Sequence, residues 1–507
     1  MGYPSRGGER EVTKRNSNQG GVGVGLHSKA LTMLKNVGGG LLLALVVIAG
    51  CMAASARGQE AAAPNIIVIG TDDNNAETLY QAMPNVVNRI GDEGATFENF
   101  TYAQSLCCPN RAATQRGQYT HNTGIYGNEG THGGFSYFLA HDEQKDTLGR
   151  TIDEAGYNTA YVGKYMNGYE DYFGVVPTGW DIWYSGRPPG TCFSANGEKR
   201  CSKKYDRQPH DRFMVDKALP IIQGWDGTAG PDMMFLSLYN PHSPCEHPAA
   251  YDDMFGNAAL TSPSYNEPDV SDKPRWVARQ DRFTSDEKRL LVQHYRCRLR
   301  AAAFTDNLIG QVLDAVDANG EPTYVIFWND NGWLNGEHRI ASKNDPYIEA
   351  ERFPLFVRGP QIAPGTTDSH MVGTVDIRPT LEDIAGAASP DYEDGSSFLP
   401  LAQGQEIPWR QYAYGENLKV DTRAGNTNLL SIGTIPRWQA VYTAVGAYHY
   451  YPDTGEEEFY SLGADPFELD GTIAPDEQAQ IGGYRDALAA FEGCAKATCR
   501  IAEEATP

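Results

Sequence analysis

The chain has little positive charge for its size. Its 507 residues include 42 Lys and Arg against 65 Asp and Glu, which gives a formal net charge of −23. Nucleic acids and anionic membrane surfaces repel a protein of this charge, so neither is expected as its main partner. An anionic ligand would therefore need a pocket that is locally basic.

Long apolar runs are also scarce. Residues 41–50 form an apolar run that follows two lysines and is too short to span a bilayer comfortably. This pattern is typical of the core of a signal peptide, so we predict that residues 1–64 are the leader of an exported protein. Two processing routes remain open. Ala54-Ser55-Ala56 suits ordinary cleavage and secretion, whereas Ile48-Ala49-Gly50-Cys51 resembles a bacterial lipobox that would leave Cys51 lipid-anchored to a membrane.

The sequence shows no cluster of cysteine and histidine with the spacing of a zinc site. Its nine cysteines instead suggest disulfides, which exported proteins form readily. Two pairs each bracket a short loop and are predicted to be bonded: Cys192 with Cys201, and Cys494 with Cys499. Cys245 and Cys297 remain as a third candidate pair, and Cys108 is left over and expected to be buried.

Short apolar runs alternate with amphipathic segments through the first three quarters of the chain. The runs predict strands at residues 66–69, 159–162, 233–238, 324–328 and 353–357. The amphipathic segments predict helices at residues 83–94, 151–155 and 290–316. Continuous apolar strands between helices are typical of a sheet buried on both faces. We therefore predict an α/β fold with a large, mostly parallel mixed sheet flanked by helices over residues 65–386.

The remainder of the chain has a different pattern. A stretch rich in Gly, Ala, Ser and Pro near residues 386–390 is a candidate boundary. Short β-like runs and a final helix at residues 478–492 follow it. Residues 387–507 are thus predicted to form a smaller antiparallel sheet with a covering helix.

Polar residues directly follow four of the predicted strands. Parallel strands bring such residues to one edge of the sheet, where ligands bind. A single case would be ordinary helix capping, but four at one edge predict a functional site. Its members are Asp72 and Asp73, Lys164, His242, and Asp330 with Asn331.

Four of these residues offer oxygen donors to a cation. Asp72, Asp73, Asp330 and Asn331 are hard ligands that suit Ca²⁺, or less well Mg²⁺, which keeps more of its water. Taken alone, the Asp pair could be a helix cap and Asn331-Gly332 a turn.

A short motif, C-x-P-x-R, lies within residues 105–124. Pro109 suits the first turn of a helix, because its missing N–H would have no partner there. Cys107 would then face the free N–H groups and positive dipole end of that helix, and Arg111 would offer a planar fork to an oxyanion. The set indicates a nucleophile placed against an anionic ester. The alternative is a pair of buried structural cysteines beside a helix start.

These motifs resemble the sulfatases. In that family the cysteine of C-x-P-x-R is oxidised to formylglycine by a formylglycine-generating enzyme, and the hydrated aldehyde is the nucleophile. The resemblance implies an alkaline-phosphatase-like fold, one calcium ion bound by Asp72, Asp73, Cys107, Asp330 and Asn331, and the hydrolysis of sulfuric esters. The Cys-Cys-Pro-x-Arg form looks most like the branch of N-acetylglucosamine-6-sulfatases and extracellular 6-O-endosulfatases. Asn110 stands where the family usually has Ser, Thr or Ala.

The resemblance also implies roles for further residues. Lys164 matches a lysine that contacts the sulfate, and Lys343 aligns with a second active-site lysine. His242 matches a histidine that can protonate the leaving group. Arg111 and the two lysines would stabilise charge on the transferring group. His338 is expected to be part of the pocket wall.

The expected substrate is a sulfated carbohydrate or an aryl sulfate, and the 6-O-sulfate of an N-acetylglucosamine-type sugar is the first to try. Five aromatic residues near the motifs could stack on sugar rings or could belong to the core: Tyr165, Tyr169, Trp180, Trp183 and Trp333. Two other functions stay open. One is a phosphonate monoester or phosphodiester hydrolase of the same superfamily, and the other is a non-catalytic relative that binds sulfated glycans.

Overall fold

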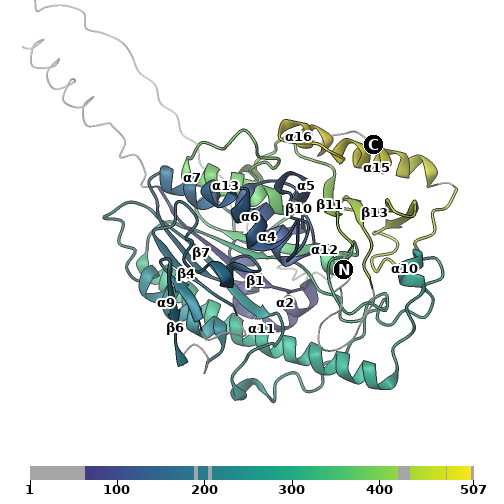
Figure 1. The fold of residues 1–507 in the computed structure, drawn as a ribbon, viewed down its shortest axis with the longest axis horizontal. Helices are drawn as coiled ribbons and strands as arrows, with labels where there is room; N and C mark the ends of the chain where they lie inside the picture. The colour runs from purple at the N-terminus through teal and green to yellow at the C-terminus, as the bar shows by residue number, and fades with distance from the viewer. Residues whose placement is uncertain (1–62, 188–191, 204–207, 421–433, 476, 504–507) are drawn as a thin grey trace, which may run out of the picture. The chain divides into compact units, whose positions relative to one another are not determined.

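A ten-stranded sheet forms the centre of the fold (Figure 1). The computed structural model describes residues 63–187, 192–203, 208–420, 434–475 and 477–503. The predicted leader, with its two processing motifs and Cys51, lies outside the described residues. Within the described ranges, no helix combines the length and apolar character that a membrane span requires.

The large sheet is mixed and mostly parallel, as predicted. Strand β9 is antiparallel to both of its neighbours, and β5 and β6 add an antiparallel edge. The other neighbouring pairs are parallel. The strands in sheet order are β10 (Thr366–Gly373), β2 (Ala95–Thr101), β9 (Arg352–Arg358), β8 (Thr323–Asn329), β1 (Asn65–Asp72), β7 (Asp232–Pro241), β3 (Asn158–Gly163), β4 (Ile182–Ser185), β5 (Cys192–Ala195) and β6 (Glu198–Cys201).

The central strands are buried on both faces. Every residue of β1 is buried, and Ile67 pairs in register with Met234 of β7 and Val325 of β8. Such strands need apolar cover on both sides, which explains their continuous apolar sequences.

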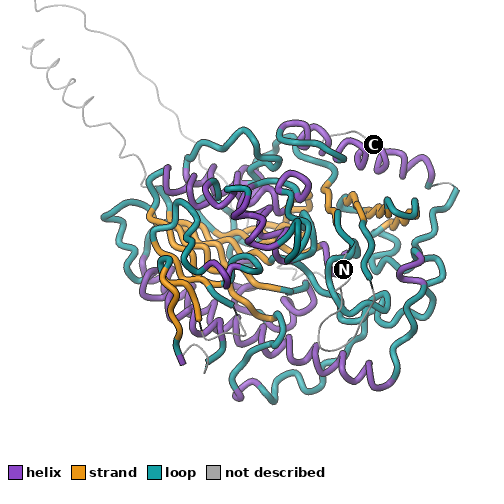
Figure 2. The backbone as a smooth tube through the Cα atoms, viewed as in Figure 1, coloured by secondary structure: helices purple, strands orange, loops and turns teal. Residues whose placement is uncertain are grey.

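Helices cover the sheet on both sides (Figures 1 and 2). The long helix α11 (Ser285–Asn319) begins at a capping box formed by Thr284 and Glu287, and it packs with α9 (His210–Ile222) and α2 (Ala76–Ala82). On the other side, α4 (Cys107–Arg116) packs with α7 (Leu148–Glu154) and α13 (Ile377–Ala385).

One predicted helix, at residues 83–94, differs in form. It comprises the short α3 (Pro84–Val86) and the π-helix η1 (Val87–Gly91). The amide of Asp92 donates to the carbonyl of Val87 at 2.8 Å, which is the wider hydrogen bond of a π-helix.

The C-terminal region contains the predicted smaller sheet. Four antiparallel strands form it in the order β11 (Ala413–Asn417), β12 (Trp438–Tyr442), β13 (Gly446–Tyr451) and β14 (Glu456–Ser461). Helix α15 (Gln478–Phe491) covers it, with Phe491 stacked on Tyr414 at a centroid distance of 4.8 Å, and α16 (Ala497–Glu503) follows. The described residues from position 63 onward form one compact unit, and the boundary near residue 386 stays a prediction.

The structure contains the two predicted short-range disulfides. Cys192–Cys201 joins β5 to β6, and Cys494–Cys499 closes the turn between α15 and α16. The third candidate pair was wrong for this structure, because Cys245 and Cys297 are both free. The thiol of Cys297 instead faces the backbone carbonyl of Cys245 at 3.7 Å. Cys108 is free and buried, as expected.

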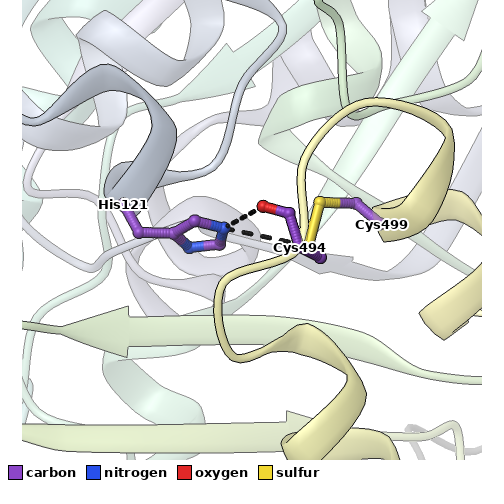
Figure 3. A group of neighbouring side chains, drawn as sticks. All are labelled: His121, Cys494 and Cys499. Atoms are coloured by element: carbon purple, nitrogen blue, oxygen red, sulfur yellow. Dashed lines mark hydrogen bonds between the residues drawn. A yellow bond between two sulfur atoms is a disulfide. The ribbon is translucent and has the colours of Figure 1, made fainter.

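His121 lies beside the Cys494–Cys499 bond (Figure 3). Its Nε2 is 2.9 Å from the carbonyl oxygen of Cys494, and its Nδ1 is 2.7 Å from Glu416 Oε1. The two sulfur atoms share a covalent bond, so they are not thiolate ligands for a metal. The contact instead ties helix α5 (Thr120–Thr123), directly after the C-x-P-x-R helix, to the C-terminal turn.

Candidate active site

The carboxyl ends of four adjacent strands bring the predicted residues together. In the order β8, β1, β7 and β3, these strands lie side by side at the centre of the sheet. Asp72 ends β1, Asp330 follows β8, His242 follows β7, and Lys164 follows β3. Cys107 joins them as the first residue of helix α4.

Buried acidic groups lie next to Cys107. Ligand-type atoms of Asp72, Asp73, Cys107 and His242 all lie within 4.8 Å of one another. Asp72 Oδ1 is 3.6 Å from Cys107 Sγ, and Asp73 Oδ2 is 3.6 Å from His242 Nε2. Asp330 Oδ1 accepts a hydrogen bond from the amide of Asp73 at 3.2 Å. All three carboxylates are buried, so this edge of the sheet concentrates negative charge away from water.

Two lysines and an arginine neutralise these carboxylates. Lys164 Nζ pairs with Asp72 Oδ2, and Lys343 Nζ pairs with Asp73 Oδ1. Burial alone would raise the pKa of Asp72, but Lys164 and other nearby positive groups hold it well below its usual range. Burial alone would lower the pKa of Lys343, but Asp73 raises it well above its usual value. Lys343 is therefore charged at neutral pH, and the three basic side chains balance the three buried carboxylates.

All three nitrogens of the Arg111 guanidinium donate hydrogen bonds to other protein groups. Nε donates to Asp330 Oδ2 at 2.8 Å, and Nη2 donates to Asp72 Oδ2 at 3.2 Å. Nη1 donates to the carbonyl of Lys164 at 2.9 Å and to Ser237 Oγ at 2.7 Å. Arg111 is buried, and in this structure it orients two carboxylates and connects residues at or after the ends of β1, β3 and β8 to Ser237 of β7.

The thiol of Cys107 is protonated at neutral pH. Burial, with the charge of Asp72, raises its pKa to about 12, although Lys164 and Lys343 act in the opposite direction. A thiol is a weak nucleophile compared with its thiolate. The side chain as encoded is therefore poorly suited to attack an anionic ester.

The donor set fits a calcium ion. Asp72, Asp73, Asp330 and Asn331 place carboxylate and amide oxygens at one edge, which is the ligand chemistry of Ca²⁺. Asn331 Nδ2 donates to Asp73 Oδ1 at 2.8 Å, and its amide oxygen accepts from Lys343 Nζ at 3.4 Å, beside the carboxylates. Burial, together with Asp72, raises the pKa of Asp330 to about 6, and a bound cation would favour its ionised form.

One sequence expectation was wrong, and the structure favours one of two alternatives left open for another set of residues. His338 was expected in the pocket wall, but it is fully buried and packs on Tyr347 at a centroid distance of 4.1 Å. The five aromatic residues that could either stack on sugar rings or belong to the core are all buried, which favours the core: Tyr165, Tyr169, Trp180, Trp183 and Trp333.

Two residues at the site were given no role by the sequence analysis. Asn110 Nδ2 donates to the carbonyl of Asp330 at 2.6 Å and its Oδ1 accepts from Ala103, so it connects helix α4 to the loop after β8. Asn329 Oδ1 accepts from Thr71 and from the amide of Asn74. The unusual residue within C-x-P-x-R was the available signal for Asn110, whereas Asn329 carried none beyond its place before Asp330.

Comparisons with known proteins agree with this geometry. A family model described as sulfatase matches residues 64–387, and one described as the C-terminal part of N-sulphoglucosamine sulphohydrolase matches residues 336–484. The chain is 26% identical over 498 residues to the N-acetylglucosamine-6-sulfatase of Capra hircus, covering 89% of this chain and 87% of the relative.

Solved structures share the fold. One is a protein in complex with its substrate D-glucosamine-2-N,6-O-disulfate, with a TM-score of 0.69, 22% identity, and coverage of 84% of this chain and 96% of the other. Another is a phosphonate monoester hydrolase of Agrobacterium radiobacter, with a TM-score of 0.65, 18% identity, and coverage of 85% and 95%. The sulfatase model spans more than half of this chain, and the chain belongs to the sulfatase family of enzymes.

Proposed function

We propose that this protein is an exported, calcium-dependent sulfatase that hydrolyses sulfate esters of carbohydrates, with formylglycine at position 107. The observation that carries the proposal is the position of Cys107, at the start of α4 between Lys343 and the buried Asp72. The raised pKa of the Cys107 thiol supports the proposal that this side chain is converted to a different nucleophile, because an unmodified thiol would stay protonated.

Each neighbouring side chain has a role in this proposal. Asp72, Asp73, Asp330 and Asn331 hold the calcium ion together with residue 107. When bound, calcium supplies a positive charge that polarises a sulfate oxygen. Once oxidised, residue 107 would supply a hydrated aldehyde as the nucleophile, held between Lys343 and Asp72.

The basic side chains bind and orient the ester. Lys164 and Lys343 stabilise charge on the transferring sulfuryl group, since both reach the carboxylate edge beside Cys107. Arg111 adds positive charge and fixes Asp72 and Asp330 in place. His242, one quarter exposed, gives a proton to the leaving alcohol oxygen.

The proposed substrate is the 6-O-sulfate of an N-acetylglucosamine-type sugar. The names of the relative from Capra hircus and of the substrate in the similar solved complex support this choice. Export through the N-terminal leader, by secretion or by a lipid anchor at Cys51, is supported by the two disulfides.

Mass spectrometry of the peptide containing Cys107, together with turnover assays, tests the proposal. The active protein should carry the aldehyde at position 107, and Cys107→Ala should remove turnover of glucosamine 6-sulfate. Cys108→Ala is the matched control and should retain the aldehyde. An unmodified thiol in active protein would refute the formylglycine assignment. Faster turnover of a phenyl phosphonate than of any sulfate ester would identify a phosphonate hydrolase instead.

A further inference from the structure

A second group of buried polar side chains lies outside the site around Cys107. His338 belongs to the loop after β8, Glu349 to helix α12 (Ile348–Glu351), and Glu468 to the loop after β14. Potential ligand atoms of these three residues lie within 4.8 Å of one another. His338 and Glu468 are fully buried, and the side chain of Glu349 is 13% exposed.

One polar atom of each side chain has no hydrogen-bond partner. These atoms are His338 Nε2, Glu349 Oε2 and Glu468 Oε1. His338 Nε2 and Glu349 Oε2 lie 3.7 Å apart, which is within the range of an ion pair but longer than a normal hydrogen bond. Leaving buried polar atoms unpaired is costly, and native proteins rarely do so without a water or an ion.

The opposite polar atom of each side chain is held by the protein. His338 Nδ1 lies 2.8 Å from Glu267 Oε2, and this contact orients the ring so that Nε2 faces Glu349. Two further bonds orient the carboxylates: Ser264 Oγ donates to Glu349 Oε1 at 3.1 Å, and the amide of Ile348 donates to Glu468 Oε2 at 2.9 Å. All three free atoms are thereby fixed in position.

This arrangement has the features of a metal site. Two ligands of one tetrahedral ion with bonds near 2.1 Å lie on the order of 3.5 Å apart, close to the separation seen here. A histidine that binds a metal commonly donates its other N–H to a carboxylate, as His338 can to Glu267. One imidazole and two carboxylates suit a first-row transition ion, in contrast to the oxygen donors around Cys107.

We propose that His338, Glu349 and Glu468 bind a structural divalent transition-metal ion, with zinc as the ion that fits best. His449 lies next to this group, because its Nε2 is 3.7 Å from Glu468 Oε1. The ion would join the loop after β8 to the region after β14. That loop also carries Lys343, so the ion would help to keep this lysine at the active site.

The wild-type protein provides the first test. It is purified without added chelator, dialysed against excess Ca²⁺, and analysed for zinc by mass spectrometry. About one zinc per chain is expected, and crystals should give an anomalous peak at the zinc edge among the three side chains. Less than about a tenth of a zinc per chain, or an anomalous peak confined to the Cys107 site, would overturn the proposal.

Variants separate this site from the active site. Glu468→Gln should lose the zinc and melt a few degrees lower, and a zinc-selective chelator should lower the melting temperature of wild type but not of this variant. Asp330→Asn, which alters the site around Cys107, should keep its zinc. Equal sensitivity of wild type and Glu468→Gln to the chelator would contradict the assignment. If Glu468→Gln fails to fold, the anomalous peak of wild type decides the question.

Discussion

Lys343 Nζ lies 2.8 Å from Cys107 Sγ and also pairs with Asp73. One side chain thus contacts both the position of the nucleophile and a carboxylate of the proposed metal site. Because Lys343 comes from the loop after β8 and Cys107 from helix α4, the pair depends on correct docking of two distant segments.

Replacement of Lys343 should impair catalysis while leaving the fold intact. Lys343→Ala removes a positive charge that would be stabilising in the transition state, so kcat/KM for a sulfate ester should fall about 10²- to 10³-fold. Steady-state kinetics measures the loss, and circular dichroism checks the fold. Lys145→Ala, at an exposed surface lysine, is the control and should behave as wild type. A loss of less than about threefold in Lys343→Ala would remove this lysine from the reaction.

Removal of the metal should stop turnover. Four side chains around Cys107 offer oxygen donors, and calcium would supply the charge that polarises the sulfate. Exhaustive chelation should abolish activity, and Ca²⁺ alone should restore it better than Mg²⁺. Calorimetric titration of the stripped protein with Ca²⁺ should show binding that is weaker in Asp330→Asn. Full activity in protein shown to be free of metal would exclude this site from catalysis.

The four strands that carry the site could be predicted from sequence. Strands β1, β3, β7 and β8 are continuous apolar runs, because they are covered on both faces and their sequences record that burial. Polar residues directly follow these apolar runs, and their positions predicted where the carboxylates gather at the edge of the sheet. Edge strand β10 was missed, because its first residues are polar and mostly exposed.

Other features depend on contacts between distant segments, which one sequence does not show. The sequence suggested that the guanidinium of Arg111 could bind an oxyanion. In the structure it forms ion pairs with Asp72 and Asp330, which are far from it in sequence. His338 lies close in sequence to Lys343, but its ring turns into the interior toward Glu267. The two disulfides, in contrast, could be predicted from sequence. Each joins cysteines that lie close together along the chain, so no contact between distant segments is needed.

Gly163 should be essential for placing Lys164. It has a φ of 122°, and a Cβ at this position would lie 1.8 Å from the carbonyl oxygen of Ser237. Gly163→Ala should therefore lower the free energy of unfolding by more than about 3 kcal/mol, as measured by urea denaturation. Gly482→Ala, in helix α15 with open space around it, is the control and should not destabilise the protein. Equal stability of Gly163→Ala and wild type would contradict the close approach of β3 and β7.

His121 should stabilise the protein in a manner that depends on pH. Burial alone would lower its pKa, but the carboxylate of Glu416 raises it to about 9. The imidazolium therefore contributes stability that is fully present below its unfolded pKa of about 6.5 and is lost as pH rises through about 9. His121→Asn should be less stable than wild type by about 1–3 kcal/mol at pH 6, and the difference should shrink by pH 10. Urea denaturation across this range measures it, and a difference that grows with pH would show that His121 is neutral in the folded protein.

His242 should matter more for sugar sulfates than for aryl sulfates. Its Nε2 faces Asp73 Oδ2 at 3.6 Å, and its ring packs against Tyr239 at a centroid distance of 4.6 Å, so it is held at the edge of the site. An alkoxide is a much poorer leaving group than a nitrophenolate and needs a proton as the bond to sulfur breaks. His242→Ala should therefore lower kcat/KM for glucosamine 6-sulfate by about 10²- to 10⁴-fold. The fold loss in kcat/KM for nitrophenyl sulfate should be smaller by a factor of about ten or more. His247→Ala, at a nearby histidine whose Nδ1 contacts the carbonyl of Cys245, is the matched control and should affect both substrates equally and weakly. Equal large losses on both substrates in His242→Ala would assign His242 to binding the sulfate and not to protonating the leaving group.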